Sequence, residues 1–408
     1  MRNTTWMLAA LITGLLAGCG GGGGGGSLQP KPLASTLLPV QGAGPTTNFG
    51  FDLGMVVGNR YYFTDRTNAS VDVFDTGSGA QVAQIKGTGA NAFAGTGASN
   101  AVSGPDGINA VGNLIYVGDV NSVKIIDPST NTIIKTIVVG NQNVRADEGC
   151  VDPTHNLYFI ATPEGSPPWV TVINTQTQMI VAQINFVDPA GNATAGLEEC
   201  QYDTASDTFF INNDGTTANP NGELISIPGA SIRGIAAGAT VNYTTLAGAV
   251  GYSEGNCDPT GLALGPGTDI AVNCREGTAG APLLVEIFNR NTGVMVTTLN
   301  AGGGDQLEYD AGQNRYFSAA SRWTPNGLSS GGSCVANGAA ACTPRLITID
   351  AGTRTILSKV ATGNNAHSVA VDPASGLVFV PVSSDASPAG CINCNNGSAG
   401  VLMLTTRY

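Results

Sequence analysis

Ionisable side chains recur in this chain at one place relative to a short strand pattern. In the segment HSVAVDP, residues 367–373, His367 stands five positions ahead of Asp372. Acidic residues hold the same place, or lie within one residue of it, in five other segments. They are Asp52, Asp106, Asp147, Glu198 and Asp305. Glu148 and Glu199 follow directly after two of these residues. If the segments surround a common axis, their charged groups meet at one opening.

Carboxylates crowded around a narrow opening raise one another's pKa unless they share a cation. Oxygen ligands in this number favour Ca²⁺ or Mg²⁺ over a transition metal. The chain has two His residues, His155 and His367, which excludes a zinc or copper centre built from His. The alternative is that these polar residues simply begin strands and face water in a channel. Both interpretations require elements that bring distant segments together.

Five stretches of the sequence align without a gap and supply those elements. Each reads as a short alternating strand, a polar turn and a second strand. The stretches are Val71–Ile85, Val123–Ile137, Val170–Ile184, Val285–Leu299 and Leu346–Val360. Two shorter windows, Leu224–Pro228 and Val401–Thr405, match the first strand of the pair. The chain therefore carries seven repeats at intervals of roughly 55 residues.

A further strand pair precedes the repeated pair in each unit, for example at 113–119 and 157–161. Four strands in each of seven units predict an all-β, seven-bladed β-propeller. The last unit ends one strand short, at Tyr408. The segment Ala34–Val40 can supply that strand from the other end of the chain. We therefore predict a propeller over residues 34–408, closed by an N-terminal strand that completes the last blade.

The repeat sequences resemble those of a known family. The phrases LIYVGD at 114–119 and DPSTNTIIKTIVVG at 127–140 are similar to the YVTN-type propeller repeat, which is close to lactonase-like seven-bladed propellers. The resemblance covers roughly residues 34–408. It implies the fold more strongly than a function, because such propellers include enzymes and binding proteins. Three Trp residues are too few for the one Trp per blade of PQQ-dependent dehydrogenases, so PQQ is not expected.

The longest predicted connections join the second and third strands of blades three to seven. They span 163–169, 213–221, 275–282, 323–344 and 383–396. In a propeller this connection lies on the same side as the start of the inner strand, beside the acidic opening. Long loops on a rigid base are typical of a binding surface. The expected binding residues are Asp52, Asp106, Asp147, Trp169, Tyr252 and Trp323. For the three aromatic residues, packing of a loop onto its blade is the alternative.

The lactonase-like resemblance also implies a possible chemistry. Gluconolactonase-type propellers hold a divalent cation with Glu, Asn and Asp from several inner strands, and a carboxylate acts as base. By this resemblance Glu148, Glu198, Asn256 and Asp305 are the implied ligands of Ca²⁺ or Mg²⁺. Glu199 or His367 is the implied base. The first blade lacks the Glu that those enzymes carry there. Binding without chemistry is therefore the leading hypothesis, and a metal-dependent hydrolase or lactonase is the alternative.

The amino end reads as a targeting segment. Arg2 precedes the apolar run Trp6–Leu16, and LAGC at 16–19 resembles a bacterial lipobox. We predict a lipoprotein signal peptide over 1–18, a lipidated Cys19, and a tether over 19–33 that contains seven consecutive glycines. Gly20, in place of Asp after the Cys, favours the outer membrane over the inner one. An ordinary signal peptide with a chance Cys is the alternative.

Eight further Cys residues, an even number, predict disulfides in an oxidising compartment. Cys257 and Cys274 lie on one predicted hairpin, and Cys150 and Cys200 hold equivalent places in consecutive repeats, so each two are expected to pair. The other four, in two long loops, pair either within or between those loops. They are Cys334, Cys342, Cys391 and Cys394. A zinc site built from these four is a less favoured alternative. The run CINCN at 391–395 lacks the His that attachment of a c-type haem needs.

Composition narrows the class of partner. Charged residues make up 11% of the 408 residues, apolar residues 42%, and Gly numbers 57, which suits a compact, turn-rich, secreted protein. The net charge of −12 disfavours nucleic acid as a partner. We therefore interpret the chain as an outer-membrane lipoprotein of the bacterial cell envelope. It would contact the membrane through its anchor only and bind a small molecule, a glycan or a protein on its acidic, looped face.

Overall fold

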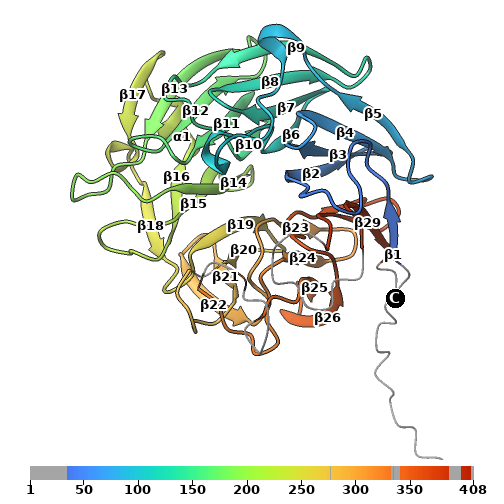
Figure 1. Ribbon diagram of the computed structural model, residues 1–408. Helices are drawn as coiled ribbons and strands as arrows, with labels where there is room; N and C mark the ends of the chain where they lie inside the picture. The colour runs from blue at the N-terminus through green and yellow to red at the C-terminus, as the bar shows by residue number, and fades with distance from the viewer. Residues whose placement is uncertain (1–34, 276, 332–333, 335–340, 386–396, 406–408) are drawn as a thin grey trace, which may run out of the picture. The chain divides into compact units, whose positions relative to one another are not determined.

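Each repeat of alternating apolar and polar residues folds into a small antiparallel sheet, and seven such sheets form a ring (Figure 1). The computed structural model describes residues 35–275, 277–331, 334, 341–385 and 397–405. The prediction of an all-β, seven-bladed propeller is confirmed. The predicted signal peptide, the lipidated Cys19 and the tether lie outside the described residues.

In blades one to six the strands follow one another outward from the axis in chain order, and in blade seven β1 is the outer strand. Blade one consists of β2 (Phe51–Val57), β3 (Arg60–Asp65), β4 (Ser70–Asp75) and β5 (Gln81–Ile85). Blade two consists of β6 (Ile108–Val111), β7 (Leu114–Asp119), β8 (Ser122–Asp127) and β9 (Thr132–Val138). Blade three consists of β10 (Gly149–Asp152), β11 (Leu157–Thr162), β12 (Trp169–Asn174) and β13 (Met179–Asn185). Blade four consists of β14 (Leu197–Asp203), β15 (Thr208–Asn213), β16 (Glu223–Pro228) and β18 (Val250–Ser253). Blade five consists of β19 (Pro259–Leu264), β20 (Asp269–Cys274), β21 (Val285–Asn289) and β22 (Val294–Leu299). Blade six consists of β23 (Leu307–Asp310), β24 (Arg315–Ala320), β25 (Arg345–Asp350) and β26 (Thr355–Ala361). Blade seven consists of β27 (Ala370–Val371), β28 (Leu377–Val382), β29 (Gly400–Thr405) and β1 (Ser35–Leu38). Short 3₁₀ helices lie at Gly89–Asn91, Asn100–Val102 and Tyr243–Thr245.

The ring closes as the sequence predicts. β1 pairs with β29 in antiparallel register, from Ser35 opposite Leu404 to Leu38 opposite Val401. The last blade thus takes its outer strand from the N-terminal side of the propeller and its other three strands from the C-terminal side. This shared sheet joins the two ends of the ring by backbone hydrogen bonds.

Turn chemistry explains why the third and fourth strands of most blades form hairpins. The Asp127 carboxylate, for example, accepts hydrogen bonds from the amide and the hydroxyl group of Ser129. Asn131 then takes a positive φ of 53° before β9 begins, a conformation that Asn tolerates better than most residues. Asn174 and Gln178 repeat the arrangement in blade three. The polar turns of the aligned repeats are therefore local signals that set each hairpin.

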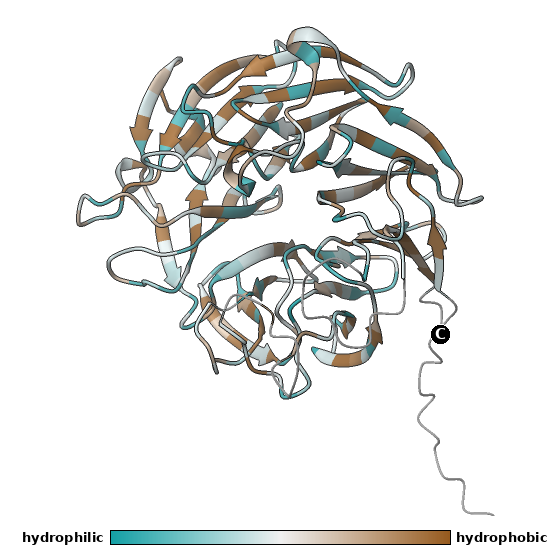
Figure 2. Cartoon of the chain, viewed as in Figure 1, coloured by the Kyte–Doolittle hydropathy of each residue, from teal (hydrophilic) through white to brown (hydrophobic). Residues whose placement is uncertain are grey.

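The hydrophobic core lies between neighbouring blades. Tyr61 of blade one stacks on Phe379 of blade seven, with ring centroids 4.7 Å apart. Tyr116 and Tyr158, from blades two and three, meet edge to face at 5.0 Å. In Figure 2 brown segments run along the strands and teal segments gather at turns and loops. Burial between blades fixes each inner strand, and therefore the residues at its start.

Blade four departs from the repeat in a way the sequence pattern does not reveal. Between β16 and β18 the chain leaves the sheet through the helix α1 (Gly229–Arg233) and the strand β17 (Ala239–Asn242). β17 pairs in parallel with β13, the outer strand of blade three. This segment, residues 229–249, is called the blade-four excursion below.

Three disulfides are present among the described residues. Cys150–Cys200 joins the inner strands of blades three and four, and Cys257–Cys274 joins the two ends of the first hairpin of blade five. Both predicted pairs are confirmed. Cys334 pairs with Cys342 inside one loop, whereas Cys391 and Cys394 lie outside the described residues. The disulfides indicate an oxidising, extracytoplasmic setting. Among the described residues, no helix is long and apolar enough to span a membrane.

Candidate functional site

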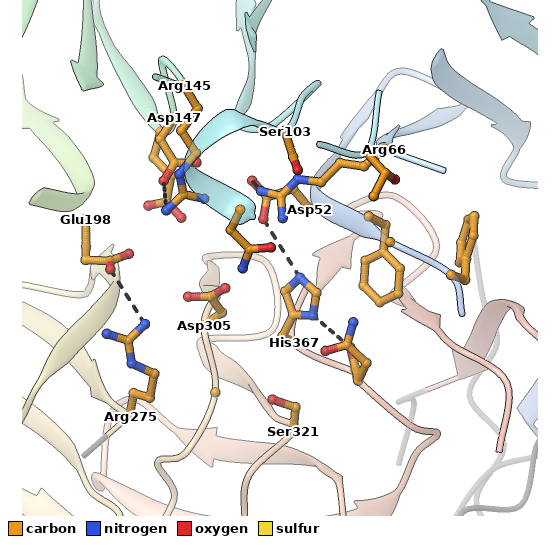
Figure 3. A pocket seen from close by; sticks show the side chains of 18 of the residues that line it. Asp52, Arg66, Ser103, Arg145, Asp147, Glu198, Arg275, Asp305, Ser321 and His367 are labelled. Atoms are coloured by element: carbon orange, nitrogen blue, oxygen red, sulfur yellow. Dashed lines mark hydrogen bonds and ion pairs between the residues drawn. The ribbon is translucent and has the colours of Figure 1, made fainter. Parts of the chain in front are cut away.

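A cavity of about 350 Å³ opens at the end of the axis where the inner strands begin (Figure 3). We call it the central funnel. Its acidic and imidazole side chains come from blades one, three, four, six and seven. They are Asp52, Asp147, Glu148, Glu198, Asp305 and His367. Residues at one offset in distant repeats thus line a single cavity, as we expected from their spacing. Asp106 does not line the cavity; it lies fully buried, bound to Arg66.

Three carboxylates meet on one side of the funnel. Oxygen atoms of Glu148, Glu198 and Asp305 all lie within 4.8 Å of one another, and we call this group the carboxylate cage. Glu148 is only 4% exposed, and among the described residues no hydrogen bond or ion pair reaches its carboxylate. Burial, followed by the neighbouring acidic groups, raises the pKa of Glu148 well above its usual value. A bound cation would relieve that cost.

An irregular strand start helps to aim Glu198 at the axis. The pairing of β14 with β15 shifts register between Leu197 and Cys200, and such irregularities re-aim side chains at strand ends. Glu198 lines the funnel, whereas its neighbour Glu199 lines a second cavity further along the axis. Burial raises the pKa of Glu198 well above its usual value, and Asp214 adds to the effect.

Arginines neutralise the other side of the funnel. The Arg66 guanidinium lies 3.0 Å from Asp52 and donates from Nε to Asp106 over 2.8 Å. Arg145 lies 2.8 Å from Asp147. Although burial opposes ionisation, Arg66 and His367 lower the pKa of Asp52 to about 2. Burial prevails at Asp106 and raises its pKa to about 8. The predicted acidic opening is therefore a segregated one, with an ion-paired half and a carboxylate-rich half.

Two further arginines border the cage. Arg275 lies 3.0 Å from Asp258 and 3.8 Å from Glu198. Arg322 lines the funnel, and its guanidinium has no hydrogen-bond or ion-pair partner in the part of the chain that the structure describes. Burial and the positive charge of Arg275 lower its pKa. Sequence reasoning missed these residues, although a signal exists. Arg66, Arg275 and Arg322 each follow within two residues of the second strand of a blade.

His367 sits at the wall of the funnel beside Asp52. Its ring stacks on Phe51 with centroids 4.6 Å apart and planes 5° from parallel. Nδ1 lies 2.7 Å from the Asn365 carbonyl oxygen, and Nε2 lies 3.8 Å from the Asp52 carboxylate. Nδ1–H is therefore the donor to Asn365, which leaves Nε2 directed toward Asp52. The stacked ring and this hydrogen bond hold the imidazole in one orientation.

Several residues predicted for the site lie away from the funnel. Asn256, an implied metal ligand, is exposed in the loop before β19, next to the disulfide-bonded Cys257. Tyr252 belongs to β18, the outer strand of blade four, where it packs against the core rather than at the opening. Neither residue lines the funnel. Their predicted positions at the opening are corrected accordingly.

The two Trp residues also pack onto blades. Trp169 begins β12, is 3% exposed and donates from Nε1 to Thr171. Lys359 and Arg345 lie over the Trp323 ring, at 4.7 and 5.7 Å from its centroid. Neither Trp lines the funnel, and the packing alternative describes both.

A second cavity of about 350 Å³ occupies the rest of the axis, which we call the lower channel. Its walls are mostly apolar side chains of the inner strands. Glu199 lines it and accepts hydrogen bonds from the Leu262 amide at 2.9 Å and the Gln201 side chain at 3.3 Å. Burial raises the pKa of Glu199 to about 8. Glu199 therefore does not share a cavity with the carboxylate cage.

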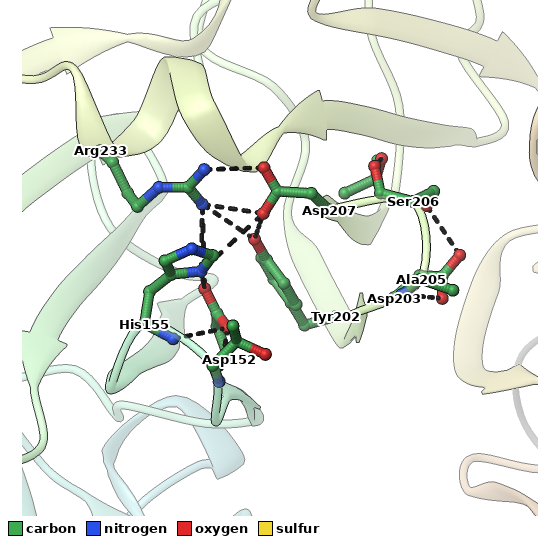
Figure 4. A network of polar contacts seen from close by, with 10 residues as sticks. Asp152, His155, Tyr202, Asp203, Ala205, Ser206, Asp207 and Arg233 are labelled. Carbon is green, nitrogen blue, oxygen red and sulfur yellow. Dashed lines mark hydrogen bonds and ion pairs between the residues drawn. The ribbon is translucent and has the colours of Figure 1, made fainter.

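His155 takes part in a separate polar cluster beside the blade-four excursion (Figure 4). Its Nδ1 lies 2.7 Å from the buried Asp152 carboxylate. Arg233, at the end of α1, forms two hydrogen bonds of 2.7 and 2.8 Å to Asp207, which also accepts one from Tyr202. We call this group the excursion clamp. Arg233 pairs with Asp207 and lies 4.0 Å from Asp152, so the clamp fastens α1 to blades three and four.

Comparisons with known proteins identify the architecture and no more. No protein-family model matches the chain. No curated protein matches it either. A solved structure of U3-55K is similar, with a TM-score of 0.59 and 10% identity, over 92% of this chain and all of that one. A chain of the mitotic checkpoint complex is similar with a TM-score of 0.58 and 10% identity, over 99% of this chain and 100% of that one. A chain of Kuenenia stuttgartiensis hydrazine synthase is similar with a TM-score of 0.57 and 15% identity, over 84% of this chain and 95% of that one. The protein is thus a seven-bladed β-propeller with a charged axial funnel.

Proposed function

We propose that this propeller binds a small charged ligand in the central funnel and performs no chemistry on it. One observation carries the proposal: the Glu148 carboxylate is buried, lines the funnel and has no partner among the described residues. A buried, unpaired carboxyl group costs free energy in the free protein. A cationic group of a ligand would recover that free energy on binding. The pocket, which is concave and has rigid walls from several inner strands, suits a small molecule better than a protein surface or a glycan chain.

A thermal-shift panel tests this proposal. The purified chain would be melted with amines, amino acids, sugar acids, CaCl₂ and MgCl₂. At a concentration about 100 times its Kd, a ligand stabilises the native state by about 2.7 kcal/mol, enough to raise Tm measurably. We expect at least one cationic compound to raise Tm, and Glu148→Gln to abolish the rise. If no compound of the panel raises Tm, or if Glu148→Gln leaves every rise intact, funnel binding is refuted.

A divalent-metal-dependent hydrolase or lactonase remains the second candidate, and the converging oxygens of the cage favour it. Three carboxylates fit a hard cation such as Ca²⁺ or Mg²⁺. The implied fourth ligand, Asn256, lies outside the funnel, so the fit covers Glu148, Glu198 and Asp305 only. A bound metal would polarise a carbonyl oxygen there. His367 lines the same cavity and is the better placed of the two implied bases.

Activity on a panel of lactones and esters, with and without chelator, tests the hydrolase. Chelator-sensitive turnover that is lost in Glu198→Ala and Asp305→Ala would establish this candidate over simple binding. Turnover that survives both substitutions would place the chemistry elsewhere. No turnover of any member of the panel would remove the hydrolase.

The cellular setting that we propose is the outer membrane, reached by lipidation of Cys19 after removal of residues 1–18. The lipobox-like LAGC sequence and the seven glycines after Cys19 support it. The YVTN-type relationship is likewise a proposal that rests on the repeat sequences. Incorporation of labelled palmitate that disappears in Cys19→Ser would support the anchor. Membrane association that persists in Cys19→Ser would contradict it.

A further inference from the structure

We propose that the ligand of the central funnel is a small zwitterion, whose primary ammonium group binds the carboxylate cage and whose carboxylate group binds Arg322. The inference rests on the proposed function and assigns a chemical class to the ligand of that site. It follows from two charged groups of opposite sign that line one cavity. Glu148 and Arg322 both lack a partner among the described residues.

The carboxylate cage offers one acceptor group for each N–H of an ammonium group, and its charge is of opposite sign. A primary ammonium group carries three N–H donors and no acceptor. The cage offers three carboxylates whose oxygens lie within 4.8 Å of one another. Glu148 and Asp305 have no side-chain hydrogen bond among the described residues, and the nearest cation to Glu198 is Arg275 at 3.8 Å. One ammonium group could therefore donate to all three carboxylates at once.

Nearby arginines favour an ammonium group over a divalent ion. Arg275 and Arg322 both line the funnel, and the electrostatic influence of Glu198 and Asp305 reaches each of them. A guanidinium repels a divalent ion twice as strongly as it repels a singly charged ammonium at the same distance. Ca²⁺ takes about six to eight oxygen ligands, which three carboxylates supply only when all are bidentate or when water completes the shell. A primary ammonium group needs one oxygen from each carboxylate, so it is the better match.

Arg322 supplies the second half of the recognition. The other three arginines of the funnel each have a carboxylate within 3.0 Å: Arg66 has Asp52, Arg145 has Asp147 and Arg275 has Asp258. Arg322 has none among the described residues, and it is partly buried. Its planar fork of donors matches a carboxylate in two-point geometry. An anionic group on the ligand would complete it.

A ligand that satisfies both groups must fit a funnel of about 350 Å³. It therefore joins the two charges by a short linker rather than a long chain. The funnel is also lined by Ser321 and Asn365, which are neutral and polar. An amino acid or a short ω-amino acid has this size and this pair of charges.

Isothermal titration of the purified chain tests the pair of charges directly. The probes are glycine, β-alanine, 4-aminobutanoate and 6-aminohexanoate, which vary the distance between the charges. Butylamine and butanoate, at the same concentrations, carry one charge each. We expect one zwitterion to bind at least about tenfold more tightly than either single-charge probe, because each loses one set of charge-assisted hydrogen bonds. Calcium chloride and magnesium chloride complete the set.

Two variants separate the roles, each with a matched control. Glu148→Gln keeps the shape of the side chain. It should lower the binding affinity for the zwitterion and for butylamine alike by at least about tenfold. Arg322→Gln should weaken only the zwitterion, so that its advantage over butylamine disappears. The controls are Glu254→Gln and Arg354→Gln. Glu254 is a buried carboxylate that lies outside the funnel and has no partner among the described residues, and Arg354 of blade six pairs with Asp269 of blade five. Both controls should bind like the unaltered chain, and thermal melting verifies that every variant is folded.

The outcomes distinguish this inference from the function on which it rests. If a metal ion or an uncharged-tail amine binds through Glu148 while no zwitterion binds better, the zwitterion is refuted and the funnel remains a binding site. If a zwitterion binds but Arg322→Gln leaves its affinity unchanged, the assignment of its carboxylate is overturned. If none of the probes binds, the inference fails, and the wider thermal-shift panel decides whether the proposed function fails with it.

Discussion

Leu38 in β1 and Val401 in β29 are register partners, so the two ends of the propeller are held together in one sheet. Both side chains are buried in the cluster that also contains Phe49, Phe51 and Phe379. The seam between the last and first blades is therefore closed by backbone pairing and by a shared apolar core. Because a ring transmits strain to every blade, the seam should influence the stability of the whole domain.

Leu38→Ala tests the seam. Leu38 is 5% exposed, and truncation of a buried Leu to Ala lowers the free energy of unfolding by about 2–5 kcal/mol. We expect chemical denaturation to show a loss in this range. Val294→Ala, on the exposed outer strand of blade five, is the control and should change the free energy of unfolding by less than about 0.5 kcal/mol. Equal effects of the two substitutions would mean that the seam strand contributes little.

Arg66→Met tests the ion-paired half of the funnel. Arg66 is 7% exposed and compensates two buried carboxylates, Asp52 and Asp106. Removing one partner of a buried ion pair typically destabilises a protein by about 3–5 kcal/mol, because the remaining charge is buried alone. We expect a loss of this size at neutral pH, where Asp52 is ionised because its pKa is about 2, with partial recovery in Arg66→Met combined with Asp52→Asn. A double variant as unstable as the single one would show that the charge of Asp52 is not the cause.

Asp72, in β4, should make stability depend on pH. Burial, and then the charge of Asp65, raise the pKa of Asp72 to about 8. A carboxyl group whose pKa is raised by folding stabilises the native state fully below its unfolded pKa of about 3.9, and this contribution is lost as the pH rises through the folded pKa. The free energy of unfolding should therefore fall between about pH 5 and about pH 9.

Asp72→Asn, which cannot ionise, should reduce that fall. Urea denaturation at the two pH values measures the difference for each protein. An equal fall in the variant and the unaltered chain would assign the pH dependence to other carboxyl groups, such as Asp106 or Glu199, whose pKa values burial also raises to about 8.

The excursion clamp should govern local motion rather than global stability. Arg233 and Asp207 are partly exposed, at 29% and 39% of their side chains, and ion pairs of this kind contribute at most about 1 kcal/mol. We expect Arg233→Gln to change global unfolding little but to speed amide hydrogen exchange across residues 229–249. Unchanged exchange there, measured against the β24–β25 hairpin as reference, would show that packing alone holds α1 in place.

The disulfide between Cys150 and Cys200 should stabilise blades three and four together. It joins two inner strands through cysteines 50 positions apart in the chain, and loss of a native disulfide typically lowers stability by about 2–4 kcal/mol. Cys150→Ser with Cys200→Ser should therefore lower Tm by several degrees. Reductant should then have a smaller effect on Tm in this double variant than in the unaltered chain. An unchanged Tm in the double variant would contradict the prediction.

The candidate site could be predicted only in part from the sequence. The offset of Asp147, Glu198 and Asp305 from their strand patterns was enough to place them around one opening, because inner strands of a propeller start at the same end of the axis. The partners of these acids were not accessible. Arg275 and Arg322 come from connections between second and third strands, and nothing local indicates which of them finds a carboxylate.

The amino-acid sequence by itself determined the number of blades, the closing strand, which was expected within 34–40 and is observed at Ser35–Leu38, and the pairs Cys257–Cys274 and Cys150–Cys200. These features depend on strand periodicity and turn chemistry, which act between residues close in sequence or repeated at one interval. Only the tertiary structure decided that Glu198 faces the funnel while Glu199 faces the lower channel. It also decided that α1 packs against blade three and that β17 pairs with its outer strand. Both depend on side-chain direction and on packing between blades. A shift of β14 by one residue would exchange the cavities that Glu198 and Glu199 face.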